Sequence, residues 1–285
     1  MLISQMSNSV LLKTQFDDNG AVQHISAFQI GQPTSALHGV ANSKLYPGMV
    51  WVTLQKDNKL LLLDPVANSL ESAPIIVKEL DVPTAGQPYG AQGPHYISEY
   101  DGNLWPRPVF VVQNPANFKF YTGLDQSHSI AKIAINGELN YLRIPASRGD
   151  TPVGMISGVN GVWFTLLGNT THGTGTIGFI DGNDNIAYHT LKDPVGQNAS
   201  LLHLAFDSDY ETNHVIWLLT SSIIKKDALD MLTKVTFDAQ WKDIVSEDYV
   251  TLPTQISKAH RVFVTPKFVF ATEFASSRVV AYLKN

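Results

Sequence analysis

Short runs of aliphatic, aromatic and β-branched residues follow one another along the whole chain, each bounded by glycine, asparagine, aspartate or proline. Clear examples are residues 50–53, 59–63, 130–135 and 278–283. Runs of this length and composition are typical of β-strands, and the Asn-Gly and Asp-Gly pairs at 136–137 and 181–182 fit tight hairpin turns. Only residues 225–232 have helical composition, which we interpret as a short turn or helix in a loop. The pattern predicts an all-β protein.

One sequence pattern repeats through these strands. A His or Val lies at the start of one strand, and ten to fourteen residues later a Trp or Phe lies at the start of the next strand, which contains a Thr in most copies. The first-strand positions are His38, His95, Val109, Val153, His203 and His260, and the aromatic positions are Trp51, Trp105, Phe120, Trp163, Trp217 and Phe270. Recurrence of this kind is typical of the blades of a propeller. We therefore predict a six-bladed β-propeller that forms one domain over residues 1–285.

Two irregularities refine this prediction. Trp105 and Phe120 are only 15 residues apart, so the blade that contains His95 lacks room for its outer strands. We interpret it as one incomplete blade of six; five full blades with an interpolated hairpin is the alternative. The last unit offers three strands, and we predict that residues 22–30 complete it, because pairing the two ends of the chain in one blade closes the ring and removes exposed sheet edges.

Composition excludes several classes of function. The net charge is -5 and the pI about 6.0, so there is no basic footprint for nucleic acid or for an anionic membrane surface. The absence of cysteine excludes disulfides, a thiolate nucleophile and a cysteine zinc site. The first residues lack the apolar run of a signal peptide. We expect a cytoplasmic protein that acts on a small molecule as a monomer or weak dimer.

Four of the six first-strand positions are histidines: His38, His95, His203 and His260. Because first strands line the axis of a propeller, we expect these side chains to converge at the mouth of its tunnel, with Glu273 near them. Such a cluster can bind a divalent metal, since imidazole is a common ligand. Against this, Leu54, Gly123 and Leu166 occupy positions where carboxylates would be needed to hold a hard ion. We therefore predict neither a metal nor another cofactor.

The alternative is a mostly apolar pocket with a few hydrogen-bond donors, in which catalysis comes from orientation and from polarising a carbonyl group. We predict that the four histidines and Glu273 carry the chemistry. The predicted substrate-binding residues are Thr53, Tyr96, Phe110, Thr122, Thr165, Leu166, Gln255, Lys258, Thr272 and Phe274.

Two groups of motifs resemble known families. Val-Trp-Phe-Thr at 162–165 and Thr-Ile-Gly-Phe-Ile-Asp-Gly at 176–182 resemble the repeat of virginiamycin B lyase. The segments 124–127, 200–207, 252–255 and 258–262 are similar to fungal lyase-like propellers, among which we place the hetero-Diels–Alderases of tropolone sesquiterpenoid biosynthesis. The second resemblance implies a metal-independent cycloaddition between an ortho-quinone methide and an alkene of a humulene-type terpene. The first implies magnesium and a histidine base that opens an ester by elimination.

The function that we predict is therefore a pericyclase of fungal secondary metabolism, a hetero-Diels–Alderase. A metal- or histidine-dependent C–O lyase like virginiamycin B lyase is the alternative, and sensitivity to a chelator discriminates the two. A propeller that binds a protein or peptide without catalysis is a third reading, which axial histidines do not favour.

Overall fold

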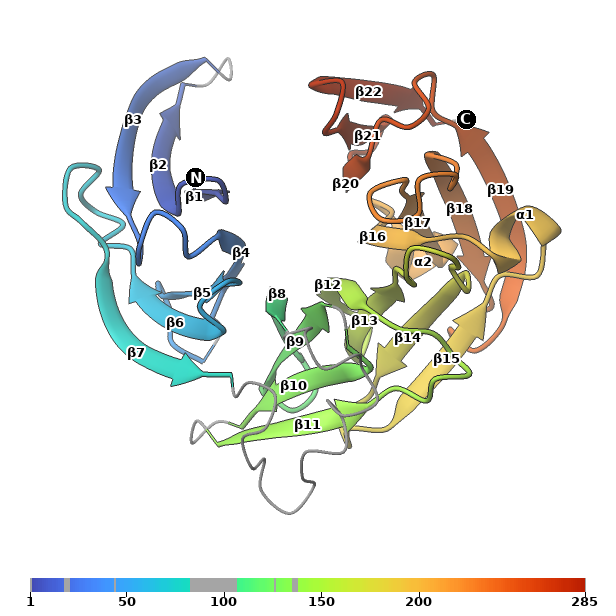
Figure 1. Cartoon of the computed structure of the whole chain (residues 1–285), viewed down its shortest axis with the longest axis horizontal. Helices are drawn as coiled ribbons and strands as arrows, with labels where there is room; N and C mark the ends of the chain where they lie inside the picture. Colours follow the sequence, from blue (N-terminus) through green and yellow to red (C-terminus); the bar gives the residue numbers. More distant parts are fainter. Residues whose placement is uncertain are drawn as a thin grey trace. The chain divides into compact units, whose positions relative to one another are not determined.

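The computed structural model describes residues 2–17, 21–43, 45–82, 107–125, 127–134 and 138–284. Its strands form six antiparallel sheets of three or four strands, and strands that follow one another in sequence are neighbours in the sheet (Figure 1). Two helices of four residues each, α1 (Pro194–Gln197) and α2 (Tyr210–Asn213), lie in connections. Six small meandering sheets with almost no helix confirm the predicted class, an all-β, six-bladed β-propeller.

The chain divides into two compact units. The first comprises residues 1–113 and 118–142, and the second comprises residues 114–117 and 143–285. The first unit contains three sheets: β1 (Leu2–Gln5), β2 (Val10–Phe16) and β3 (Val22–Gln29); β4 (Leu37–Asn42), β5 (Val50–Leu54), β6 (Lys59–Asp64) and β7 (Ile75–Asp81); and β8 (Arg107–Gln113), β9 (Phe120–Asp125), β10 (Ser129–Ile133) and β11 (Leu139–Arg143).

The second unit also contains three sheets. They are β12 (Pro152–Gly158), β13 (Gly161–Leu166), β14 (Thr176–Ile180) and β15 (Ile186–Thr190); β16 (Leu201–Phe206), β17 (Val215–Thr220), β18 (Met231–Phe237) and β19 (Ile244–Thr251); and β20 (Ala259–Val264), β21 (Phe268–Glu273) and β22 (Arg278–Leu283).

The burial of each strand follows from its place in its sheet. Second strands such as β5, β13 and β17 are buried at every position, and each has a hydrogen-bonded strand on either side of it in its sheet. Fourth strands such as β7 and β19 expose at least half of their residues and include charged side chains. The buried aromatic anchors of the repeat lie between adjacent sheets of one unit, Trp51 with Phe120 in the first and Trp163 with Phe237 in the second.

The N-terminal strand is not where the sequence predicted it. β3, which covers most of residues 22–30, is hydrogen-bonded to β2 in the sheet β1–β2–β3, and the last sheet has three strands. The expectation that residues 22–30 complete the last blade is therefore wrong. Two strands immediately before β3 supply a local partner, and closing a short loop costs less chain entropy than pairing the ends of the chain.

The six blades are consequently not the six predicted units. The N-terminal sheet is one of them, whereas the unit predicted around His95, which was expected to be the incomplete blade, lies outside the described residues. Residues 225–228 form bends and a turn that lead into β18. Within the described part of the chain, no helix is long and apolar enough to cross a membrane.

Candidate functional site

Five first strands share one irregularity. In each of β4, β8, β12, β16 and β20 the pairing with the second strand shifts by one residue near the start of the strand, which is the mark of a β-bulge. A bulge interrupts the regular alternation and redirects a side chain, and such features concentrate near functional sites. The repeated bulge therefore marks one position in each of these five blades where an unusual side chain can be presented.

The cross-strand partners align these bulges residue by residue. Leu37, Pro108, Pro152, Leu201 and Ala259 pair with the last residue, or the last but one, of their second strands. The next position is occupied by His38, Val109, Val153, Leu202 and His260. The position after that is occupied by Gly39, Phe110, Gly154, His203 and Arg261.

The alignment separates the predicted histidines. His38 and His260 occupy equivalent positions, whereas His203 lies one position later, where β20 carries Arg261. The sequence predicted a common register because it counted from each histidine to the next aromatic anchor. The connection between β16 and β17 contains α2, and its extra length conceals the shift of one residue. His95 and Tyr96 lie outside the described residues.

Threonines of the second strands hold the bulges. The hydroxyl of Thr53 accepts the backbone N–H of Gly39 at 2.7 Å, and Thr165 and Thr272 accept those of Gly154 and Arg261 at 3.1 and 3.0 Å. These three predicted substrate-binding residues thus satisfy the backbone donors that the bulges expose. Thr122 and Leu166 are also fully buried. The hydrogen bonds of Thr53, Thr165 and Thr272 thus position the first strands.

In the first unit the bulge of β4 packs against β8. The Nδ1 atom of His38 lies 3.3 Å from the carbonyl oxygen of Val109, which also accepts the hydroxyl of Thr53 at 2.7 Å. Because a carbonyl only accepts, Nδ1 of His38 carries the proton in this contact. The rings of His38 and Phe110 are 5.4 Å apart. Both residues were predicted from the sequence, and the structure brings them together.

In the second unit the bulges of β16 and β20 lie side by side and bring His203 close to the pair His260 and Arg261. The backbone N–H of Val262 donates to Nδ1 of His203 at 3.4 Å. In a neutral ring the proton is then on Nε2, so His203 is a hydrogen-bond donor at that atom. The ring of His260 lies 6.0 Å from that of Phe274, whose side chain is 64% exposed.

Arg261 is the residue of this cluster that the sequence analysis missed. Its Nη1 atom donates to the carbonyl oxygen of His260 at 2.9 Å and lies 3.2 and 3.3 Å from the two ring nitrogens of the same residue. Burial lowers the pKa of Arg261 to about 10, so its guanidinium is still charged at neutral pH. The sequence did contain a signal for Arg261: it directly follows His260, the histidine of the repeat, and a bulge presents two successive side chains.

A buried carboxylate fixes the loop that leads into this cluster. Asp230 accepts the backbone N–H groups of Ser222, Ser257 and Ala259 at 2.8–3.1 Å and the hydroxyls of both serines. The side chain of Gln255 bonds both backbone groups of Asp230. Gln255, a predicted substrate-binding residue, therefore braces the loop that ends at His260.

The remaining predicted residues of this unit surround the same loop. Lys258 is exposed, has φ +52°, and its backbone N–H donates to the hydroxyl of Ser222 at 3.1 Å. Glu273 is buried; its Oε2 accepts the hydroxyl of Ser276 at 2.7 Å, and its Oε1 has no partner among the described residues. Within this part of the chain no three His, Asp or Glu side chains are grouped so that they could hold a metal ion.

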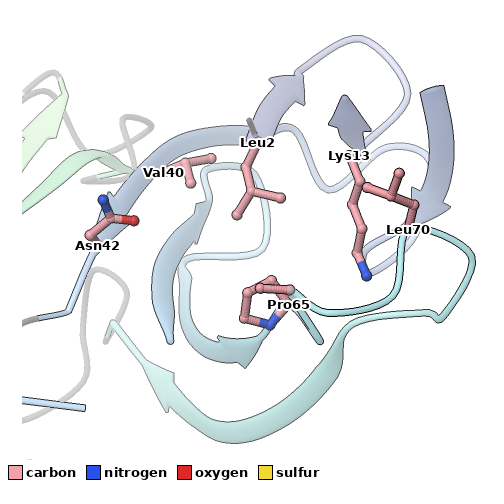
Figure 2. A pocket seen from close by; sticks show the side chains of 7 residues that line it. Leu2, Lys13, Val40, Asn42, Pro65 and Leu70 are labelled. Atoms are coloured by element: carbon pink, nitrogen blue, oxygen red, sulfur yellow. The ribbon is translucent and has the colours of Figure 1, made fainter. Parts of the chain in front are cut away.

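A cavity in the first unit carries a buried lysine. It has a volume of about 460 Å³ and lies between strands β1, β2 and β4 and the loop that follows β6 (Figure 2). Lys13 reaches from β2 toward this loop, and its Nζ atom donates to the carbonyl oxygens of Ser72, Ser69 and Val66 at 2.6, 3.0 and 3.5 Å. Burial lowers its pKa. With all three protons used, this amine acts as a clamp on the loop and is not placed as a nucleophile.

Comparisons with known proteins show similarity of fold. Neither a protein-family model nor a curated protein matches the chain. Among solved structures, a catalytically inactive variant of virginiamycin B lyase from Staphylococcus aureus with quinupristin is 13% identical, with a TM-score of 0.65 over all of this chain and 80% of the other. A streptogramin B lyase is 18% identical, with a TM-score of 0.56 over 99% of this chain and 89% of the other. A periplasmic gluconolactonase from Pseudomonas aeruginosa is 12% identical, with a TM-score of 0.67 over 97% of this chain and 73% of the other.

These structural neighbours are propeller enzymes of the lyase and lactonase type, and they support the resemblance to virginiamycin B lyase at the level of fold. At such low identity they carry over no substrate and no catalytic residue. The chemistry must be argued from the side chains of this chain.

Proposed function

We propose that the chain is a hetero-Diels–Alderase that joins an ortho-quinone methide of a tropolone or phenolic polyketide to an alkene of a humulene-type terpene in fungal secondary metabolism. The observation that carries the proposal is the pair of neighbouring bulges in the second unit, where N–H donors of His203 and Arg261 lie on adjacent first strands. The similarity of segments 200–207 and 258–262 to fungal cyclases, noted above, supports the same reading.

The reaction requires donors and orientation, and no other chemistry. The four-atom unit C=C–C=O of the quinone methide and the two alkene carbons form one new C–C and one new C–O bond, with no loss of protons or electrons. Negative charge grows on the carbonyl oxygen as the transition state is approached, and a placed N–H donor stabilises it. Holding both partners face to face lowers the barrier further, by roughly 7 to 11 kcal/mol at the favourable limit.

Each part of this site has a role in that scheme. The guanidinium of Arg261 and Nε2 of His203 donate to the quinone methide oxygen, and His260 positions the guanidinium. The exposed ring of Phe274, next to His260, offers an apolar surface for the terpene. In the first unit, His38 gives its Nδ1 proton to the carbonyl oxygen of Val109, so the pair of His38 and Phe110 does not supply a donor of the same kind.

The test is a cycloaddition assay with the purified chain. An ortho-quinone methide is generated in solution from a hydroxymethyl phenol or tropolone in the presence of humulene, and the rate and stereoisomer ratio of the adducts are measured by chiral chromatography. We expect acceleration and one dominant stereoisomer. Arg261→Met and His203→Phe should each slow the reaction about 10²-fold to 10³-fold, the loss found when one donor to a developing oxyanion is removed. His172→Phe, on an exposed loop of the same unit, is the control.

An adduct mixture identical to that of the uncatalysed reaction would refute the proposal. Retention of turnover in excess EDTA is expected, and its loss on chelation would favour the second candidate.

That second candidate is a C–O lyase that opens an ester or lactone by elimination. It is favoured by the contact between His260 and Arg261, because an imidazole can remove a proton while an adjacent guanidinium stabilises the resulting enolate. Incubation of the chain with a cyclic depsipeptide or a lactone, followed by mass spectrometry, tests this candidate. Elimination opens the ring with no change of mass and leaves an alkene, hydrolysis adds water, and an enzyme of cycloaddition alone leaves the ester intact.

A further inference from the structure

The cavity in the first unit that contains Lys13 is open to a small molecule. Its volume of about 460 Å³ is within the range of ligand pockets in proteins. Leu2 and Lys13, which are cross-strand partners in β1 and β2, form one wall, and Val40 and Asn42 of β4 form the second. Leu2 and Val40 are half-buried and Asn42 is exposed, so a molecule in the cavity has access to all three side chains.

The third wall of the cavity is the loop that follows β6. Pro65, Ala67 and Leu70 of this loop line the cavity. Figure 2 shows Leu2 and Pro65 in its middle, the residues of β4 at one end, and Lys13 with Leu70 at the other. Ala67 is exposed and Leu70 half-buried. The loop therefore determines the shape of the cavity, because it closes the side that the strands leave free.

A buried lysine fixes the position of this loop. Lys13 is 3% exposed, and its ammonium group gives all three protons to carbonyl oxygens of the loop, those of Val66, Ser69 and Ser72. Removing an ammonium group from water is costly unless hydrogen bonds compensate for the lost hydration. The loop is consequently held in one place by an interaction that a loop free to collapse onto the strands would not need.

Val66 shows that the same loop is also strained. It has φ +48°, which is rare for a β-branched residue. The backbone N–H of Val66 donates to Oδ1 of Asp64 at 2.8 Å, and its carbonyl oxygen accepts the N–H of Ser69 at 2.9 Å. Strain of this kind persists where surrounding contacts enforce it, and it concentrates at functional sites and ligand clamps. Val66 lies between two residues that line the cavity, so the strained turn shapes the cavity wall.

The accessible groups of the cavity define the molecule that it can hold. Among the described residues that line it, Lys13 is the only charged one, and its protons are already donated to the loop. An ionic ligand would therefore lose its hydration without gaining a hydrogen-bonded partner of opposite charge. Leu2, Val40 and Leu70 offer aliphatic surface, and the amide group of Asn42 offers N–H donors and an acceptor oxygen.

We propose that this cavity binds a neutral, compact aliphatic molecule that carries one hydroxyl or carbonyl group. Its hydrocarbon skeleton lies against Leu2, Val40 and Leu70, and its oxygen atom lies at the amide group of Asn42. The cavity shares no residue with the donor cluster of the second unit, so this inference does not rest on the proposed function. Menthol has the required chemistry, and p-menthane is the same skeleton without the hydroxyl group.

Equilibrium dialysis of the whole chain against menthol or p-menthane, with gas chromatography of both compartments, tests this inference. We expect saturable binding of menthol, and binding of p-menthane that is about fivefold weaker, the usual effect of one neutral hydrogen bond. Asn42→Leu should bind the two probes equally. Val40→Phe fills the cavity with a ring and should weaken menthol binding about tenfold or more. Val245→Phe, the same change at an exposed position of β19, is the control and should leave binding unchanged.

Circular dichroism melts establish that the variants are folded. The proposal is overturned by the absence of saturable menthol binding, by equal affinity for menthol in Val40→Phe and the wild type, or by tighter binding of decanoate, an anion with a hydrocarbon chain, than of menthol. Equal weakening in Val245→Phe and Val40→Phe would also contradict it, because the effect would then not come from the cavity. His203→Phe, in which cycloaddition is expected to be slowed, should bind menthol as the wild type does, so the two proposals are tested separately.

Discussion

Gly154 is the residue on which the placement of His203 depends most directly. A Cβ atom at this position would lie 2.6 Å from the carbonyl oxygen of Leu202 and 2.8 Å from Cα of His203, closer than real contacts allow. Gly39 has the same relation to Val109 and Phe110 in the first unit. In both places glycine lets two bulges approach each other, and the reason is space, because neither glycine has a positive φ.

We predict that Gly154→Ala lowers the free energy of unfolding by about 1–3 kcal/mol, the usual cost of overpacking. It should also displace the ring of His203, which histidine NMR signals report, and erode the stereoselectivity of cycloaddition. Gly39→Ala is the matched variant: it should destabilise to a similar degree and leave the His203 signal unchanged. A stable Gly154→Ala protein with an unaltered signal would contradict this account of the packing.

At the scale of elements, the loop that leads to His260 is held by the side chain of Asp230 as well as by strand pairing. Asp230 ends the connection between β17 and β18 and accepts three backbone N–H groups: that of Ser222 in the same connection, and those of Ser257 and Ala259 where the chain enters β20. We predict that Asp230→Asn destabilises the protein by about 2–4 kcal/mol, since an amide group is placed against N–H donors that lose their acceptor. Urea unfolding measures the change.

The control for this variant is Asp193→Asn. That aspartate caps α1, on the surface, with a single bond to the N–H of Val195 at 2.8 Å, and its replacement should cost no more than about 1 kcal/mol. An equal loss of unfolding free energy in the two variants would show that Asp230 stabilises the protein no more than a surface helix cap does.

The elements were predictable from the sequence where hydrophobic pattern and turn chemistry agree. The strands that contain Trp51, Trp163 and Trp217 carry a dense β-branched and aromatic pattern, and each was found. The sheet of the N-terminal residues was missed, because β3 was assigned to a distant partner. The register of His203 was missed because a bulge is a property of two paired strands, and one strand's sequence does not show it. Arg261 was overlooked for the same reason.

At the scale of the whole molecule, the stability at acid pH is expected to depend on carboxylates whose pKa is lowered by their contacts. Asp207 is 4% exposed, and its hydrogen bonds with Lys284, Trp217 and Asn213 hold its pKa at about 2 against the effect of burial. Asp181 also has a lowered pKa, through the N–H groups of the turn that it closes. A pKa below its value in the unfolded chain means that the contribution is complete above about pH 4 and is lost as pH falls toward 2.

We therefore predict that the midpoint of urea unfolding falls steeply below pH 4, as the unfolded chain takes up protons that Asp207 and Asp181 do not. Lys284→Met should flatten this dependence and lower stability at neutral pH by about 1–3 kcal/mol, because it leaves the Asp207 carboxylate short of a charged donor. If the urea midpoint of Lys284→Met depended on pH below pH 4 as that of the wild type does, the ion pair between Lys284 and Asp207 would not be the cause of the loss of stability in acid.

The bulges have a consequence for how this protein can change. Each of the five bulged first strands contains one residue more than its partner, while the ladder on either side keeps its phase. Gly39 and Gly154 have no room for a side chain, whereas the equivalent positions of β16 and β20 carry His203 and Arg261. Substitution at the positions that carry side chains can therefore alter the chemistry of the site while the strand pairing stays the same. Deletion of a single codon in the same place would remove the extra residue, leave a regular ladder and take away one of the two successive side chains that the bulge presents. New activities on this scaffold are thus expected to arise by point mutation at the bulges and to be lost when a bulge is deleted.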